Sequence, residues 1–334
     1  MRRPRLKVAG EGFYHVVSRI GGRRFLMDNG EKQVLLGMIR AAAEFSGVEV
    51  HTHALMDNHF HLLIRVPQRE EVDDGELAHR VRALYGAERS ERLFAQWAKW
   101  EAKGQSSRME EAKKRLRARM YDLSQFCKTF KETYSQDYNR RHDNTGTIWE
   151  GRFKSILLEG SWRVLMTVAA YIHLNPVRAG VVEETEAATN TGYGAACAGD
   201  PEARQGLVSL VRRFMDAGTT GWESVRETLQ EAMDGALAKD AVLAFSEASP
   251  SASPGTAPVD DASTSGGSAG HLSLHELLRG RCIGFLHGGV LGSRGFLASQ
   301  AALLPPRRRQ RPESVLDHYS SLGLAVALGI RDAS

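Results

Sequence analysis

The sequence predicts an α+β fold, in which a ferredoxin-like antiparallel sheet carries helices packed on one of its faces. One observation predicts this fold class, and a second predicts an insertion within it. Segments of strand and helix character follow one another in the order strand, helix, strand, strand, helix, strand, helix as far as residue 174. A charged, alanine-rich stretch with little strand character, residues 68–119, interrupts this order and predicts a helical insertion. We therefore expect one main domain over residues 5–185.

Four segments have the composition of strands, because they are rich in β-branched and aromatic residues and adjoin turn-forming residues. They are residues 13–20, 48–56, 59–66 and 152–158. The turn-prone pair Asp57 and Asn58 separates the second from the third. Pro67 ends the third strand, since a proline has no backbone N–H to give to a sheet.

Three further segments are predicted to form helices, and a glycine or a proline marks the end of two of them. They are residues 31–45, 123–141 and 162–174. Gly47 closes the first. The last must end near Asn175, because Pro176 disfavours helical geometry in the residue before it. We expect a helical extension over residues 186–245, with one or two amphipathic helices after residue 200.

A change in composition marks the C-terminal part of the chain. Ser246 to Gly270 consists almost entirely of Ser, Ala, Gly, Pro, Thr and Asp. Such a segment cannot bury enough apolar surface to offset the entropy lost on ordering. We expect a disordered linker over residues 246–271 and a small C-terminal domain over residues 272–330.

The overall composition narrows the class of protein. The 334 residues are 42% apolar and 25% charged, so a core can form, and a net charge of +4 with a pI near 9.0 mildly favours a polyanionic partner. Three widely spaced cysteines without a CxxC pair argue against a disulfide framework and a cysteine zinc site, and indicate a reducing compartment. No apolar run approaches about 18 residues, so we expect no membrane span. No apolar segment follows the basic N-terminus, so we expect no secretory signal.

The strongest local pattern is a pair of histidines, His59 and His61, on a predicted strand. Residues two apart on a strand point to the same face, and paired imidazole nitrogens suit a divalent metal. An HxH pair also occurs by chance. His51 and His53 have the same spacing on the preceding strand, but the residue between them is polar, which makes them the poorer candidate pair.

A second group of polar residues lies on the apolar helix that begins at Trp162. Tyr171 and Asn175 are four residues apart and so share a helix face. A tyrosine phenol can act as a covalent nucleophile, and an asparagine oxygen can complete the coordination shell of a metal. A core aromatic and a helix cap are the alternative interpretation. Tyr134 and Tyr138 are rival nucleophiles, although their spacing equally suits ordinary packing.

Four blocks of sequence resemble, in the same order, the single-tyrosine HUH transposases, in which U is a large apolar residue. The blocks are FYHVVSR (13–19), DNHFHLLIRVP (57–67), TGTIWEGRFKS (145–155) and YIHLNPVRAGVV (171–182). The last closely resembles the catalytic-helix signature of the REP-associated tyrosine transposases. The resemblance covers residues 5–185, and residues 278–297 are similar to a C-terminal extension of some members. The insertion at 68–119 departs from the family pattern.

The resemblance implies the HUH fold and a specific site. His59 and His61 would bind Mg²⁺ or Mn²⁺, Asn175 would be the third protein ligand, and Tyr171 would be the nucleophile. The metal would act as a Lewis acid on the scissile phosphate. Attack by the phenol, whose unperturbed pKa is near 10, would give a 5′-phosphotyrosine and a free 3′-OH. The implied function is a transposase that cuts and rejoins hairpin-forming single-stranded DNA, during transposition or the processing of REP elements.

Basic residues near these blocks are candidate DNA contacts. Arg152 and Lys154 alternate with an apolar residue on a predicted strand, so one face of that strand is basic and either contacts phosphates or is solvated. Four more candidates, which equally suit an exposed helix surface, are Lys128, Lys131, Arg140 and Arg141.

Two other functions stay open at this point. The same scaffold suits a non-catalytic, sequence-specific DNA-binding regulator, although binding alone requires neither the histidine pair nor the tyrosine. It also suits a metal-dependent hydrolase that uses water, with Tyr171 structural. We further expect a cytoplasmic, nucleoid-associated bacterial protein that acts as a monomer, although members of the family include dimers that share active sites.

Overall fold

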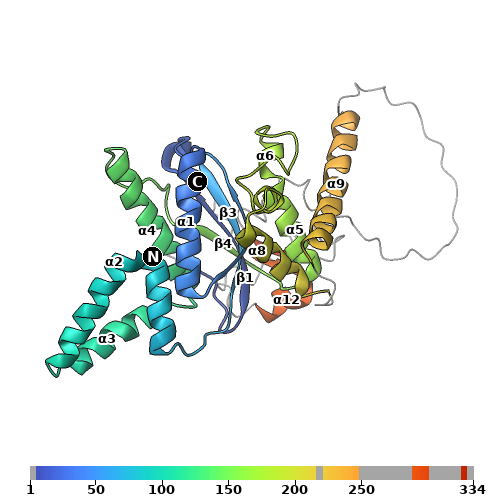
Figure 1. The fold of residues 1–334 in the computed structure, drawn as a ribbon. Helices are drawn as coiled ribbons and strands as arrows, with labels where there is room; N and C mark the ends of the chain where they lie inside the picture. The colour runs from blue at the N-terminus through green and yellow to red at the C-terminus, as the bar shows by residue number, and fades with distance from the viewer. Residues whose placement is uncertain (1–4, 216–220, 248–287, 301–324, 329–334) are drawn as a thin grey trace, which may run out of the picture.

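A computed structural model describes residues 5–215, 221–247, 288–300 and 325–328 (Figure 1). At its centre lies a six-stranded sheet with the spatial order β2-β3-β1-β4-β5-β6. The strands are β1 (Gly12–Arg19), β2 (Glu49–Leu55), β3 (His59–Val66), β4 (Lys154–Leu158), β5 (Gly288–Gly292) and β6 (Ala325–Leu328). The first four pair antiparallel, as predicted, and β5 pairs parallel with β4.

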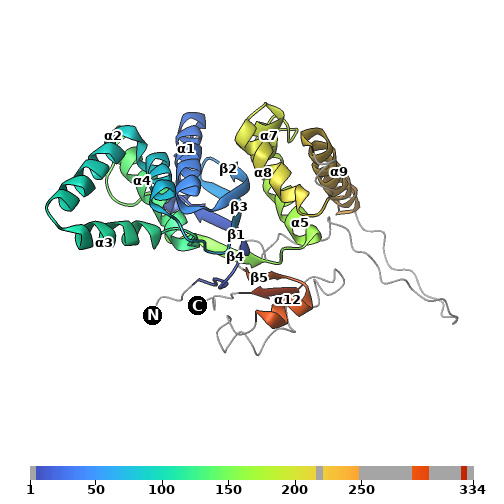
Figure 2. The same cartoon turned by 60° about the horizontal axis from the view of Figure 1, so that its bottom comes forward.

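Helices cover both faces of this sheet. They are the 3-10 helix η1 (Gly21–Arg23), α1 (Asn29–Ser46), α2 (Asp74–Ala102), α3 (Ser106–Arg117), α4 (Leu123–Arg141), α5 (Trp162–His173), α6 (Asn175–Arg178), α7 (Gly192–Cys197), α8 (Pro201–Arg212), α9 (Trp222–Glu247) and α12 (Arg294–Ser299). Figure 2 shows α1 and α4 on one side of the sheet and α5, α7 and α8 on the other.

The prediction of helices on only one face was therefore wrong, whereas the α+β class is confirmed. Alternate residues of β1 and β3 explain the two layers. Tyr14 and Phe60 belong to the core under α1 and α4. Phe13 and Leu63 belong to the core under α5 and α8. Because both faces of the strands are apolar, each needs a covering layer.

The predicted insertion forms a helical hairpin, α2 and α3, that projects from the sheet in Figure 1. It has a small core of its own, in which Leu77, Val81 and Trp97 of α2 meet Phe45 of α1. The N-terminal end of α2 is capped by Asp73, whose side chain accepts from the backbone N–H of Glu76. No helix within the described ranges combines the length and the apolar character that crossing a bilayer requires.

The described part of the tail extends the sheet rather than forming a separate layer. Val290 and Leu291 of β5 stand opposite Leu157 and Leu158 of β4 and are buried. Beyond the strand, the Ser293 backbone N–H donates to a Glu159 carboxylate oxygen at 2.6 Å. The expected linker, 246–271, lies outside the described residues except at its start, which still belongs to α9.

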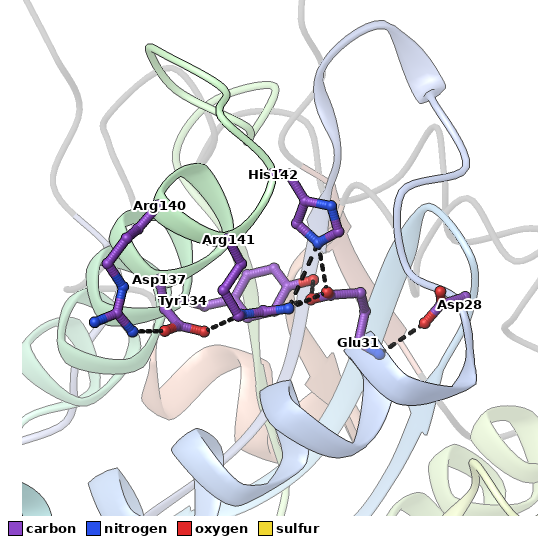
Figure 3. A network of polar contacts seen from close by, with 7 residues as sticks. All are labelled: Asp28, Glu31, Tyr134, Asp137, Arg140, Arg141 and His142. Atoms are coloured by element: carbon purple, nitrogen blue, oxygen red, sulfur yellow. Dashed lines mark hydrogen bonds and ion pairs between the residues drawn. The ribbon is translucent and has the colours of Figure 1, made fainter.

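A buried carboxylate joins the two helices of one face (Figure 3). Glu31 of α1 accepts from the Arg141 guanidinium at 2.8 Å, and His142 lies 2.8 Å from its other oxygen. The Tyr134 hydroxyl donates to the same carboxylate at 3.0 Å. Hydrogen bonding from Arg141 lowers the pKa of Glu31 to about 2. The contacts fix the N-terminal turn of α1 against the C-terminal half of α4.

Replacing Glu31 with Gln should lower the free energy of unfolding at pH 7 by about 2 kcal/mol, because the charge-assisted bonds to Arg141 weaken. A carboxylate whose folded pKa is depressed stabilises fully above its unfolded pKa and loses this effect as the pH falls through the folded value. The difference in unfolding free energy between wild type and variant should therefore become smaller as the pH falls from 4.5 to about 2. Urea unfolding curves at pH 7 and pH 3 measure it. A gap that is equal at both pH values would contradict the role of the charge.

Candidate functional site

His59 and His61 stand side by side on β3, with ring centroids 5.1 Å apart and ring planes at 77°. Phe60 points to the opposite face, where it packs edge-on against Phe130 and Trp149, each with a centroid distance of 5.6 Å. The alternation of the strand thus places both imidazoles on the face covered by α5. This is the arrangement that the HxH spacing predicted.

Tyr171 lies against this histidine pair. Its ring is 5.7 Å from that of His61, centroid to centroid, at an interplanar angle of 79°. The helix α5 brings it there because Val164, Val168 and Ile172 are buried and hold the helix on the sheet. Strand β3 and helix α5, which are far apart in the sequence, therefore meet where Tyr171 packs against His61.

Asn175 begins the short helix α6, directly beyond the end of α5. Its side-chain Nδ2 donates to the backbone carbonyl of Tyr171 at 2.8 Å. A carbonyl accepts only from the nitrogen of the amide, so this bond sets the orientation of the side chain. The Asn175 oxygen, which is the atom that a cation requires, is not used in this bond.

Two residues outside the predicted site hold the histidines in place. His15 of β1 is fully buried, and its Nε2 lies 2.9 Å from Nδ1 of His61. The Asn58 oxygen accepts from Nδ1 of His59 at 2.7 Å. Because both contacts use Nδ1, the ring nitrogens that remain for a metal are the Nε2 atoms. A polar residue in the apolar run FYHVV was the available signal for His15.

The electrostatics of the pair suit metal binding. Burial lowers the pKa of His59 to about 4 and that of His61 well below its ordinary value of 6.5. Both rings are therefore neutral at pH 7, the form that coordinates a metal. Within the described residues, no three His, Cys, Asp or Glu side chains gather as a metal site. A site built on His59 and His61 would take any third protein ligand from a residue of another type, such as Asn175.

The second histidine pair has a structural environment. The His51 Nδ1 lies 3.0 Å from the Ser209 hydroxyl and 3.3 Å from the Gly206 carbonyl oxygen, both on α8. His53 is buried, and burial lowers its pKa to about 4. The pairing of β2 with β3 shifts register between Val50 and Thr52, at the position of His51. The contacts of His51 tie it to α8 rather than to Tyr171.

The rival tyrosines lie on the other side of the sheet. Tyr134 is completely buried, donates to Glu31 and belongs to the core that includes Phe60. Burial raises the pKa of its phenol. Tyr138 stacks on His142 with a centroid distance of 4.2 Å. Of the three tyrosines, Tyr171 is the one in contact with the histidine pair.

The candidate DNA contacts divide into two groups. Lys154 is exposed and stands opposite Val17, which in turn stands opposite His61. Lys154 therefore lies on the same face as the histidine pair, and its backbone is roughly 10 Å, or two strand spacings, from that of His61. Arg152 is exposed just before β4. The other group lies on α4, which packs on the opposite face of the sheet.

One of the candidates on α4 must be corrected. Lys131 is buried, and its Nζ donates to the Ser18 hydroxyl at 2.7 Å and to the Gly151 carbonyl at 3.1 Å, so it is not available to DNA. The sequence placed it among basic residues of a helix surface, but its position within the apolar spacing of α4 turns it inward. Arg140 and Arg141 both pair with Asp137, and Lys128 is exposed.

The comparison with family models agrees with the resemblance over part of the chain. Residues 11–88 match the family model described as "Transposase IS200 like". One solved structure that is similar is described as a REP-associated tyrosine transposase bound to a REP hairpin. It is 14% identical, with a TM-score of 0.40, and the match covers 60% of this chain and 87% of the other. No curated protein matches the chain.

Proposed function

Because residues 11–88 match the IS200-like transposase family, we propose that the protein cuts and rejoins single-stranded DNA through a covalent bond to Tyr171. The single observation that carries this proposal is the position of the Tyr171 ring, 5.7 Å from that of His61 on the histidine-bearing face of the sheet. A phenol beside paired imidazoles can reach a phosphate that is bound there.

The proposed reaction exchanges one phosphodiester for another. The Tyr171 oxygen attacks the phosphorus and loses its proton, and the bond from phosphorus to the 3′ oxygen breaks. The 3′ oxygen takes up a proton, which leaves a free 3′-OH and a 5′-phosphotyrosine. A second 3′-OH reverses the exchange and joins the strands. No nucleotide cofactor is needed, since the energy of the bond is retained.

His59, His61 and the side-chain oxygen of Asn175 would hold a divalent cation, Mg²⁺ or Mn²⁺. When bound, such an ion supplies Lewis-acid stabilisation of the charge on the phosphate. The protein contributes the neutral rings, their fixed orientation through His15 and Asn58, and the bond that ties Asn175 to the Tyr171 carbonyl.

The substrate that we propose is a hairpin-forming single strand. All the proposed groups come from one chain, so a monomer would suffice for cleavage. Lys154 lies on the side of the sheet that carries the histidine pair, and Arg152 is exposed just before the same strand. Both are suited to contacting the phosphates of the DNA strand.

The test is to trap the covalent intermediate. The full-length protein is incubated with a 5′- or 3′-labelled hairpin oligonucleotide and Mg²⁺, denatured, and separated by electrophoresis. We expect a protein–DNA adduct that retains the 3′ label, because Tyr171 is joined to the new 5′ phosphate of the downstream fragment, whereas the 5′-labelled fragment is released with a free 3′-OH. Cleavage without an adduct would instead support a hydrolase that uses water, and binding without cleavage would support a DNA-binding regulator.

His15 provides a further prediction about this site. His15→Leu removes the acceptor for the His61 Nδ1–H, so affinity for Mn²⁺ should fall about 10- to 100-fold. His15→Gln keeps an acceptor and should restore much of the loss. Isothermal titration with Mn²⁺ measures both, and the melting temperature of each variant checks the fold. Equal Mn²⁺ affinity of the wild type and the folded Leu variant would show that His15 does not orient His61.

A further inference from the structure

The loop between β1 and α1 carries an aromatic side chain that the fold does not use. Phe25 is 78% exposed, the largest exposure of a large apolar side chain among the described residues. Arg23 and Arg24 precede it and are exposed as well. An exposed aromatic ring beside two guanidinium groups is a combination that suits a nucleotide, because the ring offers a face to a base and the cations attract phosphates.

The loop is attached to the turn that leads into His59. The Asn58 side chain, which accepts from His59, donates through its Nδ2 to the Arg23 carbonyl at 3.3 Å. The Met27 N–H donates to the Asp57 carbonyl at 3.0 Å. In Figure 1 the loop lies at the upper end of the sheet, the end at which α6 also lies. The loop therefore borders the histidine pair.

The charge of this border is positive. Arg19 stands directly opposite His59 in the pairing of β1 with β3. In the parts of the chain that the structure describes, Arg19, Arg23 and Arg24 form no ion pair with an acidic side chain. Of the acids near this border, Asp57 pairs with Lys32 at 2.6 Å, and Asp28 caps α1. Three guanidinium groups thus remain for an anion from outside the protein.

The backbone of the loop is also unusual. Gly22 has φ 66° and Arg23 has φ 54°, so two successive residues are left-handed. This conformation is strained for a non-glycine residue, and such strain persists only where surrounding contacts impose it, often at ligand sites. The contacts here are those to Asn58 and Asp57, which hold the loop in one shape beside the histidines.

We propose that this loop binds the nucleotide next to the scissile phosphate of a single-stranded DNA, with Phe25 stacked on the base and Arg23 and Arg24 on the flanking phosphates. The inference rests on the proposed function and adds to it the surface that holds the strand. Stacking on an aromatic ring tolerates different bases, so the surface orders the strand rather than reading its sequence.

The experiment uses the full chain carrying Tyr171→Phe, so that binding is measured without cleavage. A hairpin oligonucleotide with a single-stranded flank carries the fluorescent base 2-aminopurine at each flank position in turn. We expect quenching at one position, lost in Phe25→Ala and retained in Phe25→Trp. Affinity should fall about 5- to 100-fold in Phe25→Ala, the effect of losing one stacked base. Phe214→Ala, at another partly exposed phenylalanine, is the matched control and should bind like the parent.

A double variant, Arg23→Ala with Arg24→Ala, should bind more weakly and reduce the slope of log affinity against log salt by about 0.7 for each phosphate that these arginines neutralise. If Phe25→Ala binds and quenches like its parent, the proposed surface is wrong. Adduct formation by the wild-type protein tests the proposed function separately. Adducts together with an inert Phe25 overturn only the surface, and Phe25-dependent quenching without adducts supports the surface but not the strand transfer. Absence of single-strand binding overturns both.

Discussion

Tyr171→Phe should abolish strand cleavage and the covalent adduct while leaving the fold intact. The substitution deletes one oxygen and keeps the ring that packs against His61 and His15. Loss of the nucleophile should lower the single-turnover rate by on the order of 10⁴-fold or more, to the background of the assay. The measurements are adduct formation on a labelled hairpin with Mg²⁺, and thermal unfolding to check that stability changes little.

Tyr134→Phe is the matched control for this result. It deletes the same atom from a tyrosine on the other face of the sheet, where the hydroxyl donates to Glu31. We expect a stability loss of about 1 kcal/mol and no loss of cleavage. An adduct that persists in Tyr171→Phe would make Tyr134 or Tyr138 the candidate nucleophile. Cleavage that persists without an adduct would mean that water is the nucleophile.

Local patterns predicted the parts of the fold that local chemistry determines. The strand 59–66 and the helix 123–141 begin and end at the predicted residues. In both cases a turn or a cap fixes the start: Asp57 and Asn58 precede the strand, and the Asp122 side chain caps the helix by accepting from the Gln125 N–H. The side-by-side placement of the two imidazoles follows in the same way from the period of a strand.

Long-range contacts account for what the sequence did not predict. The parallel pairing of β5 with β4 joins segments separated by more than a hundred residues. The composition of β5, GGVLG, does not indicate which strand it pairs with. That helices cover both faces of the sheet was not predicted, because it depends on which helices pack on each apolar face of the strands. The role of His15 could not be predicted from the sequence, because its contact with His61 depends on the register in which β1 pairs with β3.

The histidine pair is the second position at which a large effect is expected. His59→Ala or His61→Ala should abolish cleavage with Mg²⁺, as should EDTA with the wild-type protein, because the site loses a metal ligand or the metal. Single-strand binding should fall little, since basic groups on the surface supply it. Mn²⁺ titration, cleavage rate and oligonucleotide anisotropy are measured on each variant.

His59→Ala is the more informative of the two variants. His59 is only partly buried, and its Nδ1 contact is to Asn58 in an adjacent turn. His61 is fully buried, so its removal also deprives His15 of its hydrogen-bond partner and should cost about 1–3 kcal/mol of stability. His53→Ala is the control: it removes a buried histidine from β2 and should leave Mn²⁺ affinity and cleavage largely intact as long as the protein stays folded. If His59→Ala binds Mn²⁺ and cuts at the wild-type rate while remaining folded, these histidines do not form the metal site, and the mechanism proposed for Tyr171 would need another source of charge stabilisation.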